Sequence, residues 1–223
     1  LGETLERFSF EAALESRLLR ARGWIELMSG ERGAARETLG RALALAGDDP
    51  SGAATAESYL GVLAEKSERF SDALASYQRA LDALNRLDEN GSRRAHDWYL
   101  RGQAFQIMEQ YEQAIDCYDK ASSLDAENIH TWLALGWCHK RSGRLDLAIQ
   151  ALEEALDVDS SEAIVHYNLA CYWSLANNVK LAVAYLSSAF DIDSNFRDLV
   201  SDETDFDAIR DDPSFQAVLT VNV

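Results

Sequence analysis

Apolar residues recur along most of the chain at the spacing of helices that bury one face. Residues 145–155 give the clearest example, with apolar side chains in the i, i+3, i+4, i+7 pattern. The side chains that form it are Leu145, Ala148, Ile149, Leu152 and Ala155. Residues 3–15 contain no helix breaker and have apolar residues at nearly the same spacing. The pattern predicts an all-α fold.

One arrangement of residues recurs with a fixed period between Trp98 and Phe196. Small residues stand at Gly102, Gly136 and Ala170, which are 34 residues apart. Two further alanines and a leading large ring keep the same register: Ala114, Ala148 and Ala182; Ala121, Ala155 and Ala189; Trp98, Trp132 and His166. Where two helix axes cross only about 8 Å apart, a branched side chain would push the backbones apart. The small positions therefore indicate close helix crossings in a repeated unit.

A 34-residue period with a large ring, a small residue and two alanines resembles the tetratricopeptide repeat. The resemblance implies an all-α, right-handed α-solenoid of about five helix–turn–helix units, followed by C-terminal capping helices. It covers most of the chain. The family's proline near the end of each unit is absent, and Ala126, Ser160 and Ser194 stand in its place.

The register of the repeat divides the chain into expected segments. Residues 1–15 are expected to form a lead-in helix, either a cap or the second helix of a further unit. The five units that follow are 16–49, 54–87, 95–128, 129–162 and 163–196. Residues 197–223 depart from the period and are expected to form a helical acidic cap, because a repeat array ends in a unit with a polar outer face.

Three local features refine these boundaries. Residues 48–52 (DDPSG) give the strongest loop signal in the chain. The step from Gly61 to Gly102 is seven residues longer than the period, and leucines continue the apolar face beyond Ala80, so two extra helical turns are expected to end near Asn90–Gly91. Pro213 is typical of the first turn of a short helix within the cap.

The chain is strongly acidic, with 38 acidic and 21 basic residues and a net charge of −17. Repulsion from phosphate groups argues against nucleic acid or a membrane surface as a main partner. No run of about 18 apolar residues is present, so no membrane span is expected. Three cysteines at no metal-like spacing, and no visible targeting leader, favour a cytoplasmic protein. The chain begins with Leu rather than Met, which leaves open whether it is part of a longer protein.

The first helix of each unit carries apolar groups on more than one face. In the fourth unit, Leu133 and Trp137 form a second stripe, one residue round from the core stripe of Trp132 and Gly136. In the family resembled, these offsets line the concave face, where peptide segments bind; the alternative is that neighbouring helices bury some of them. The expected groove residues are Arg20, Trp24, Val62, Tyr99, Gln103, Leu133, Trp137, Lys140, Arg141, Tyr167 and Cys171.

The family's clamp for a C-terminal carboxylate is not expected here. The matching positions carry no lysine or arginine; they are Tyr99, Gln103, Ala134, Ile164 and Asn168. Five basic residues lie at or near the groove positions: Arg17, Arg20, Lys66, Lys140 and Arg141. They suit an acidic or phosphorylated ligand, but we favour the view that they neutralise surrounding acidic residues.

No catalytic or metal-binding motif is found in the sequence. His96 and His130 hold equivalent places in adjacent units, so about 20 Å separates them, too far to share a metal ion. The cysteines are expected to be inert thiols. We therefore expect a non-catalytic adaptor, without cofactor or metal, that binds a peptide or helix of another protein. The alternative is a scaffold that self-associates, its groove filled by a neighbour's terminus.

Overall fold

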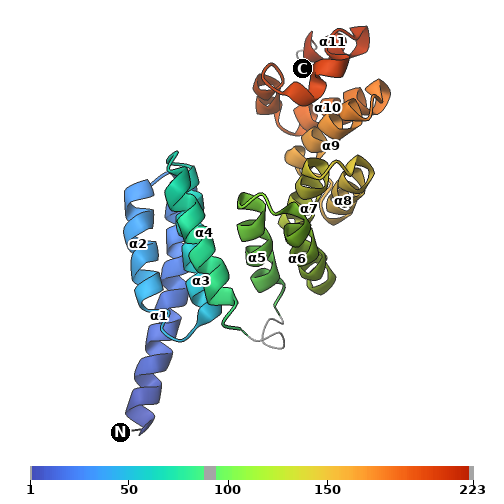
Figure 1. The fold of residues 1–223 in the computed structure, drawn as a ribbon. Helices are drawn as coiled ribbons and strands as arrows, with labels where there is room; N and C mark the ends of the chain where they lie inside the picture. The colour runs from blue at the N-terminus through green and yellow to red at the C-terminus, as the bar shows by residue number, and fades with distance from the viewer. Residues whose placement is uncertain (1, 88–93, 221–223) are drawn as a thin grey trace. The chain divides into compact units, whose positions relative to one another are not determined.

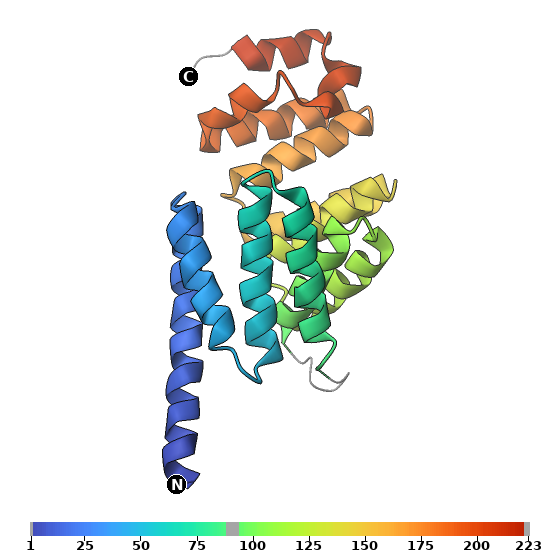
Figure 2. The same cartoon turned by 60° about the vertical axis from the view of Figure 1, so that its left-hand side comes forward.

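The computed structural model describes residues 2–87 and 94–220, and within them every regular element is a helix. The chain divides into two compact units, Leu1–Leu124 and Asp125–Val223. Each consists of consecutive helices that lie alongside their neighbours in the sequence (Figures 1 and 2). Among the described residues, no helix is both long enough and apolar enough to cross a bilayer.

The first unit contains three helical pairs, and each pair packs most extensively within itself. Its helices are α1 (Gly2–Met28), α2 (Arg32–Ala44), α3 (Pro50–Glu65), α4 (Phe70–Leu84), α5 (Ala95–Ile107) and α6 (Tyr111–Leu124). We call the first helix of each pair helix A and the second helix B. Successive A helices contact one another, α1 with α3 and α3 with α5. They therefore form one continuous face of this unit.

The second unit contains two further pairs and a C-terminal cap. The pairs are α7 (Ile129–Arg141) with α8 (Leu145–Val158), and α9 (Ala163–Leu175) with α10 (Val179–Ile192). The cap consists of two 3₁₀ helices, η1 (Ser194–Leu199) and η2 (Thr204–Ile209), and the short helix α11 (Pro213–Thr220). η1 and α11 pack on α10, whereas η2 packs on helix A of the last pair, α9.

The small positions of the repeat lie at the crossings of helices A and B. A Cβ built at Gly102 would be 2.5 Å from the ring of Tyr118, and one at Gly136 would be 3.2 Å from the carbonyl oxygen of Ala148. The equivalent glycines, Gly23 and Gly61, face the side chains of Leu39 and Tyr77 in the same way. The prediction that these residues permit close crossings is confirmed.

Every turn between helices A and B contains one residue in the left-handed region. These residues are Gly30, Glu68, Glu109, Gly143 and Asn177, with φ between 57° and 79°. In the α7–α8 turn, the N–H of Arg144 donates to the carbonyl of His139, and the N–H of Gly143 to that of Lys140. Such bonds satisfy the last carbonyls of helix A and reverse the chain. The repeat is therefore visible in the backbone as well as in the sequence.

Three expected boundaries differ from the structure. No separate lead-in helix ends near residue 15, because α1 is continuous from Gly2 to Met28. α3 begins at Pro50, inside the expected loop, since proline suits a first helical turn. The two extra turns of the second unit are wrong: α4 ends at Leu84, whose carbonyl accepts a hydrogen bond from Arg101 Nη2 at 2.7 Å. The expected stop at 90–91 lies outside the described residues.

The cap buries large side chains against the last helical pair. Phe206 and Phe215 are fully buried, with ring centroids 5.3 Å apart, in one core with Leu186 and Phe190. Arg210 holds the segment before it in place, because its guanidinium donates to the carbonyls of Val200 and Glu203. The cap thus extends the core of the second unit beyond the last repeat, although two of its three helices are 3₁₀ rather than α.

Candidate protein-binding face

The A-helix face of the first unit carries a row of three aromatic rings. Trp24 on α1 lies against Tyr59 on α3, with ring centroids 4.7 Å apart, and 37% of Trp24 is exposed. Tyr99 on α5 is half-buried; burial raises its pKa, and the nearby Tyr59 raises it further. We call Trp24, Tyr59 and Tyr99 the aromatic row. One ring from each A helix contributes to it.

Arg20 is one turn before Trp24 and is largely engaged within the chain. Its Nη1 donates to Ser16 Oγ at 3.1 Å and lies 3.8 Å from a carboxylate oxygen of Asp49. Burial lowers the pKa of Arg20, and the neighbouring Asp49 acts in the opposite direction. Its guanidinium also occupies the space that a Cβ at Gly52 would need. Arg20 therefore ties α1 to the beginning of α3 in addition to bordering the aromatic row.

The other two expected groove residues of this unit contribute less exposed surface. Val62 is half-buried and packs against two core clusters, one around Leu27 and Leu63 and the other around Tyr77. Gln103 is also half-buried. They border the face rather than project from it. Tyr59 was not predicted from the sequence. It stands one residue after the repeat position of Leu133, at the position that Ala134 occupies in the fourth repeat.

In the second unit, Trp137 is the most exposed of the expected rings. It lies on α7, is 36% exposed, and has the guanidinium of Arg141 5.5 Å from its ring centroid. Leu133, one turn earlier, is half-buried and packs against the core of this unit. A tryptophan with an arginine over its ring presents a flat apolar surface with a positive edge, a combination common at binding hot spots.

Three expected groove residues of the second unit contact the chain's own cap. Tyr167 is only 4% exposed, because the rings of Phe196 and Phe206 lie 5.1 and 5.8 Å from its own. Cys171 is buried beside the segment before η2, and Lys140 forms an ion pair with Asp205. The expectation that these side chains are open to a partner is wrong for Tyr167 and Cys171, whereas Lys140 stays partly exposed but is paired with the cap. The cap packs on the part of helix A where a groove ligand was expected to bind.

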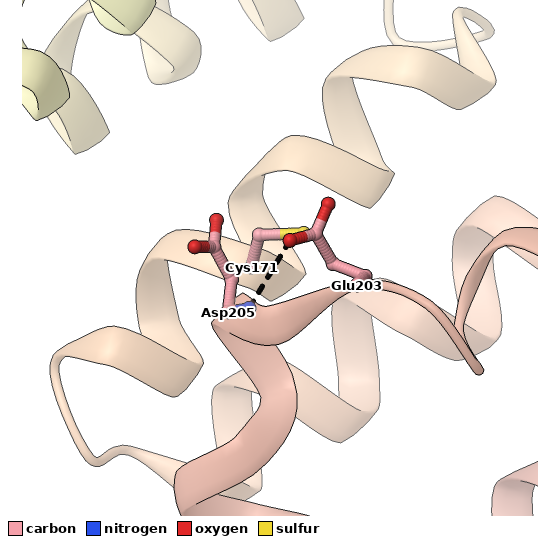
Figure 3. A group of neighbouring side chains, drawn as sticks. All are labelled: Cys171, Glu203 and Asp205. Carbon is pink, nitrogen blue, oxygen red and sulfur yellow. Dashed lines mark hydrogen bonds between the residues drawn. The ribbon is translucent and has the colours of Figure 1, made fainter.

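Cys171, Glu203 and Asp205 bring a thiol and two carboxylates together, with one ligand atom of each within 4.8 Å of the others (Figure 3). A carboxylate oxygen of Glu203 accepts from the backbone N–H of Asp205 at 3.1 Å. The positive charge beside the acids is the Lys140 ammonium, and burial raises the pKa of the Cys171 thiol well above its usual range. These contacts fit a structural junction between α7, α9 and the cap better than a cation site.

Burial also raises the pKa of the other two thiols, to about 11 for Cys117 and about 12 for Cys138. All three thiols are buried. A thiol that remains protonated at neutral pH is a poor nucleophile and a poor metal ligand. These cysteines therefore serve as small apolar core residues.

Comparison with solved structures identifies similar all-α proteins. MamA 41-end from Desulfovibrio magneticus RS-1 is 16% identical, with a TM-score of 0.55 over 81% of this chain and 96% of that one. YrrB, described as a TPR protein with an unusual peptide-binding site, is 21% identical, with a TM-score of 0.52 over 84% and 93%. At these identities the likeness establishes the fold. Comparison with curated protein sequences finds no match.

Family models agree with the repeat read from the sequence and the structure. Models of the tetratricopeptide repeat match residues 20–88, 97–128 and 129–162. Together these ranges span more than half of the chain and include α2 to α8 apart from the first two residues of α5. With the small residues at the helix crossings and the left-handed residue in each turn, they show that the chain belongs to the tetratricopeptide repeat family.

Proposed function

We propose that the A-helix faces bind a segment of another protein and that the chain acts as a non-catalytic adaptor. The observation that carries the proposal is the aromatic row together with Trp137. Large rings in partly exposed positions give much contact area and lose few side-chain rotamers on binding. Surface rings of this size, held in place by neighbouring helices, are a usual feature of protein–protein contacts.

The chemistry around these rings indicates the kind of segment that would bind. Arg141 lies over Trp137, and Arg20 borders the aromatic row, but Asp49 offsets the charge of Arg20. The chain as a whole has a net charge of −17, so an acidic segment would meet long-range repulsion. We expect a bound segment to insert apolar or aromatic side chains against the rings and to carry neutral or basic flanking residues.

YrrB supports the general mode of binding, since it has this fold and is described as having a peptide-binding site. The position of that site is not transferred to this chain. Because Tyr167 and Cys171 are buried under the cap, the proposed surface in the second unit consists of Leu133, Trp137 and Arg141. In the first unit the surface consists of the aromatic row with Arg20, Val62 and Gln103.

The test uses peptides selected from a random displayed library on the full chain, then synthesised. Their affinity is measured by titration calorimetry for wild type, Trp24→Ala and Trp137→Ala. Loss of a hot-spot ring is expected to weaken binding by about 30-fold or more, equivalent to about 2 kcal/mol. Phe70→Ala is the matched control, since Phe70 is a more exposed ring on a B helix, α4.

Circular dichroism on the same samples separates binding from folding. If neither tryptophan variant weakens binding while Phe70→Ala does, the binding surface lies on the B helices. If no library peptide binds above background, the proposed peptide-binding function is wrong.

A further inference from the structure

A second exposed apolar surface lies on α1, beside the Trp24 end of the aromatic row. All but one of its members are large apolar side chains, with exposed fractions of 70% for Phe10, 62% for Leu18 and 64% for Ile25. Leu14 and Met28 are also exposed. We call Phe10, Leu14, Leu18, Ala21, Ile25 and Met28 the α1 stripe. It holds more exposed large apolar side chains than any other described helix.

α1 is apolar on two faces, and its own unit uses only one of them. The buried residues, among those whose side chains are described, are Ser16, Leu19, Gly23, Glu26 and Leu27. Gly23 lies against Leu39 of α2, and Leu27 lies in a core cluster with Ala35 and Leu63. The stripe lies on the remaining side of the helix. An apolar surface of this kind on an otherwise charged helix is typical of an interaction site.

The spacing of the stripe is that of helix-to-helix packing. Leu14, Leu18, Ala21, Ile25 and Met28 are separated by four, three, four and three residues. This alternation keeps one seam on one side of a helix when it packs along a second helix. From Phe10 to Met28 the stripe is about 27 Å long at the rise of an α-helix. A matching occupant is a helix of similar length with the same repeat.

The charge of this segment favours a second copy of the chain as that occupant. Residues 10–28 contain three acids and three arginines, so the segment is neutral in a chain of net charge −17. Two copies would repel one another over most of their surface. The α1 stripe is a surface through which they can approach without that repulsion.

The arrangement of charges beside the stripe sets the direction of pairing. Glu15 and Arg22 flank it on one side, and Arg17 lies on the other. In an antiparallel pair centred between residues 18 and 21, Glu15 faces Arg22 of the second copy, and this contact occurs twice by symmetry. A parallel pair would instead place Arg17 opposite Arg22 of the second copy. Like charges at that contact disfavour the parallel arrangement.

Existing contacts of these side chains do not prevent such a pair. Glu15 lies 3.4 Å from Arg41, but both side chains are more than half exposed. Arg22 donates from Nε to the buried Glu26 at 2.6 Å, but its own side chain is two-thirds exposed, and a guanidinium has further N–H groups that can reach a second carboxylate. The exposed pair of Glu15 and Arg41 contributes little to stability and can be exchanged for another. We infer that the α1 stripe is a self-association surface, through which two copies pair by antiparallel packing of α1.

The first test is the mass of the full chain in solution. Sedimentation velocity over about a hundredfold range of concentration should show a monomer–dimer equilibrium, because association depends on concentration. Leu18→Glu should raise the dimer dissociation constant by at least about tenfold, as a charge then lies in the apolar seam. Leu147→Glu, at an exposed leucine on α8, is the matched control and should leave association unchanged.

Charge reversals test the direction of pairing. Glu15→Lys alone and Arg22→Glu alone should each weaken the dimer, and a mixture of the two variants should restore it, because each then faces its opposite charge. A parallel pair would respond differently, since Arg22→Glu would relieve the contact with Arg17 and strengthen association. Strengthening by that change therefore contradicts the antiparallel arrangement.

Two further results would overturn the inference. One is a wild-type chain that stays monomeric at every concentration; the other is a dimer that Leu18→Glu leaves intact while circular dichroism shows both proteins folded. Neither result bears on the peptide-binding proposal, which is tested with Trp24 and Trp137.

Discussion

At the scale of single residues, the rings that lead the fourth and fifth repeats have a definite bonding role. The indole N–H of Trp132 donates to the carbonyl of Ala126 at 2.8 Å. Nε2 of His166 lies 2.9 Å from the carbonyl of Ser160, and because a carbonyl oxygen only accepts, this nitrogen carries the proton. The two contacts are 34 residues apart and hold the loop before helix A. They act where the family's proline is missing.

The left-handed turn residues give a prediction at the same scale. Glu109 has a φ of 58°, which costs a residue with a Cβ about 1–2 kcal/mol. Glycine adopts this conformation freely but loses more backbone entropy on folding, about 0.5–1 kcal/mol. Glu109→Gly should therefore raise the free energy of unfolding by about 0.5–1 kcal/mol. Urea denaturation followed by circular dichroism measures the change.

The control for this prediction is Gln113→Gly. Gln113 is exposed within α6. Glycine there should lower the free energy of unfolding by about 1 kcal/mol, because α6 is helical at this position. If both substitutions destabilise the protein equally, the left-handed conformation at Glu109 carries no strain.

At the scale of helices, the crossing of α7 and α8 gives the second prediction. A Cβ at Gly136 would be 3.2 Å from the carbonyl oxygen of Ala148, which is backbone and cannot rotate away, and 3.3 Å from Leu152. Gly136→Leu should therefore cost more than the 1–3 kcal/mol of ordinary overpacking. Thermal denaturation measures it, with Gly33→Leu as the control, because a Cβ at Gly33 meets nothing within 4 Å. Equal melting temperatures for wild type and Gly136→Leu would contradict the observed crossing.

Much of the helical architecture is predictable from the sequence, because the small and large positions that pair helices recur every 34 residues. The end of α4 was not predictable in this way. Leu87 continues its apolar face beyond Leu84, but Arg101 from the next pair bonds to the Leu84 carbonyl. Likewise, no local signal distinguishes α1 as one helix from two. Helix ends here depend on contacts with neighbouring pairs rather than on the local pattern.

The candidate face was predicted in part for a related reason. The offset from the core stripe correctly indicated exposed rings at Trp24 and Trp137. It could not indicate that Phe206 packs on Tyr167 or that Asp205 pairs with Lys140. The 34-residue period ends before the cap, so it does not predict where the cap packs. Tyr59 was missed because the prediction took a single repeat position for each turn of helix A, whereas the exposed helix face includes the next position as well.

At the scale of the whole molecule, the cap gives the last prediction. Phe206 is fully buried, lies 5.8 Å from the ring of Tyr167, and belongs to the core cluster that includes Leu186 and Phe190. Phe206→Ala should create a cavity and lower the free energy of unfolding of this unit by about 3–5 kcal/mol. Because repeat arrays are stabilised mainly by contacts between neighbours, amide hydrogen exchange should quicken most in α9 and α10. α2, in the first unit, serves as the internal reference.

Phe10→Ala is the matched control for this prediction, because Phe10 is a phenylalanine with 70% of its surface exposed. It should leave exchange in α9 and α10 unchanged. Unaltered exchange in Phe206→Ala would mean that the cap is held on α9 by Asp205 and its contacts with Lys140 and Ser174 rather than by its rings. In that case Asp205→Asn, which removes the ion pair with Lys140, should quicken exchange in the cap more than the loss of the ring does.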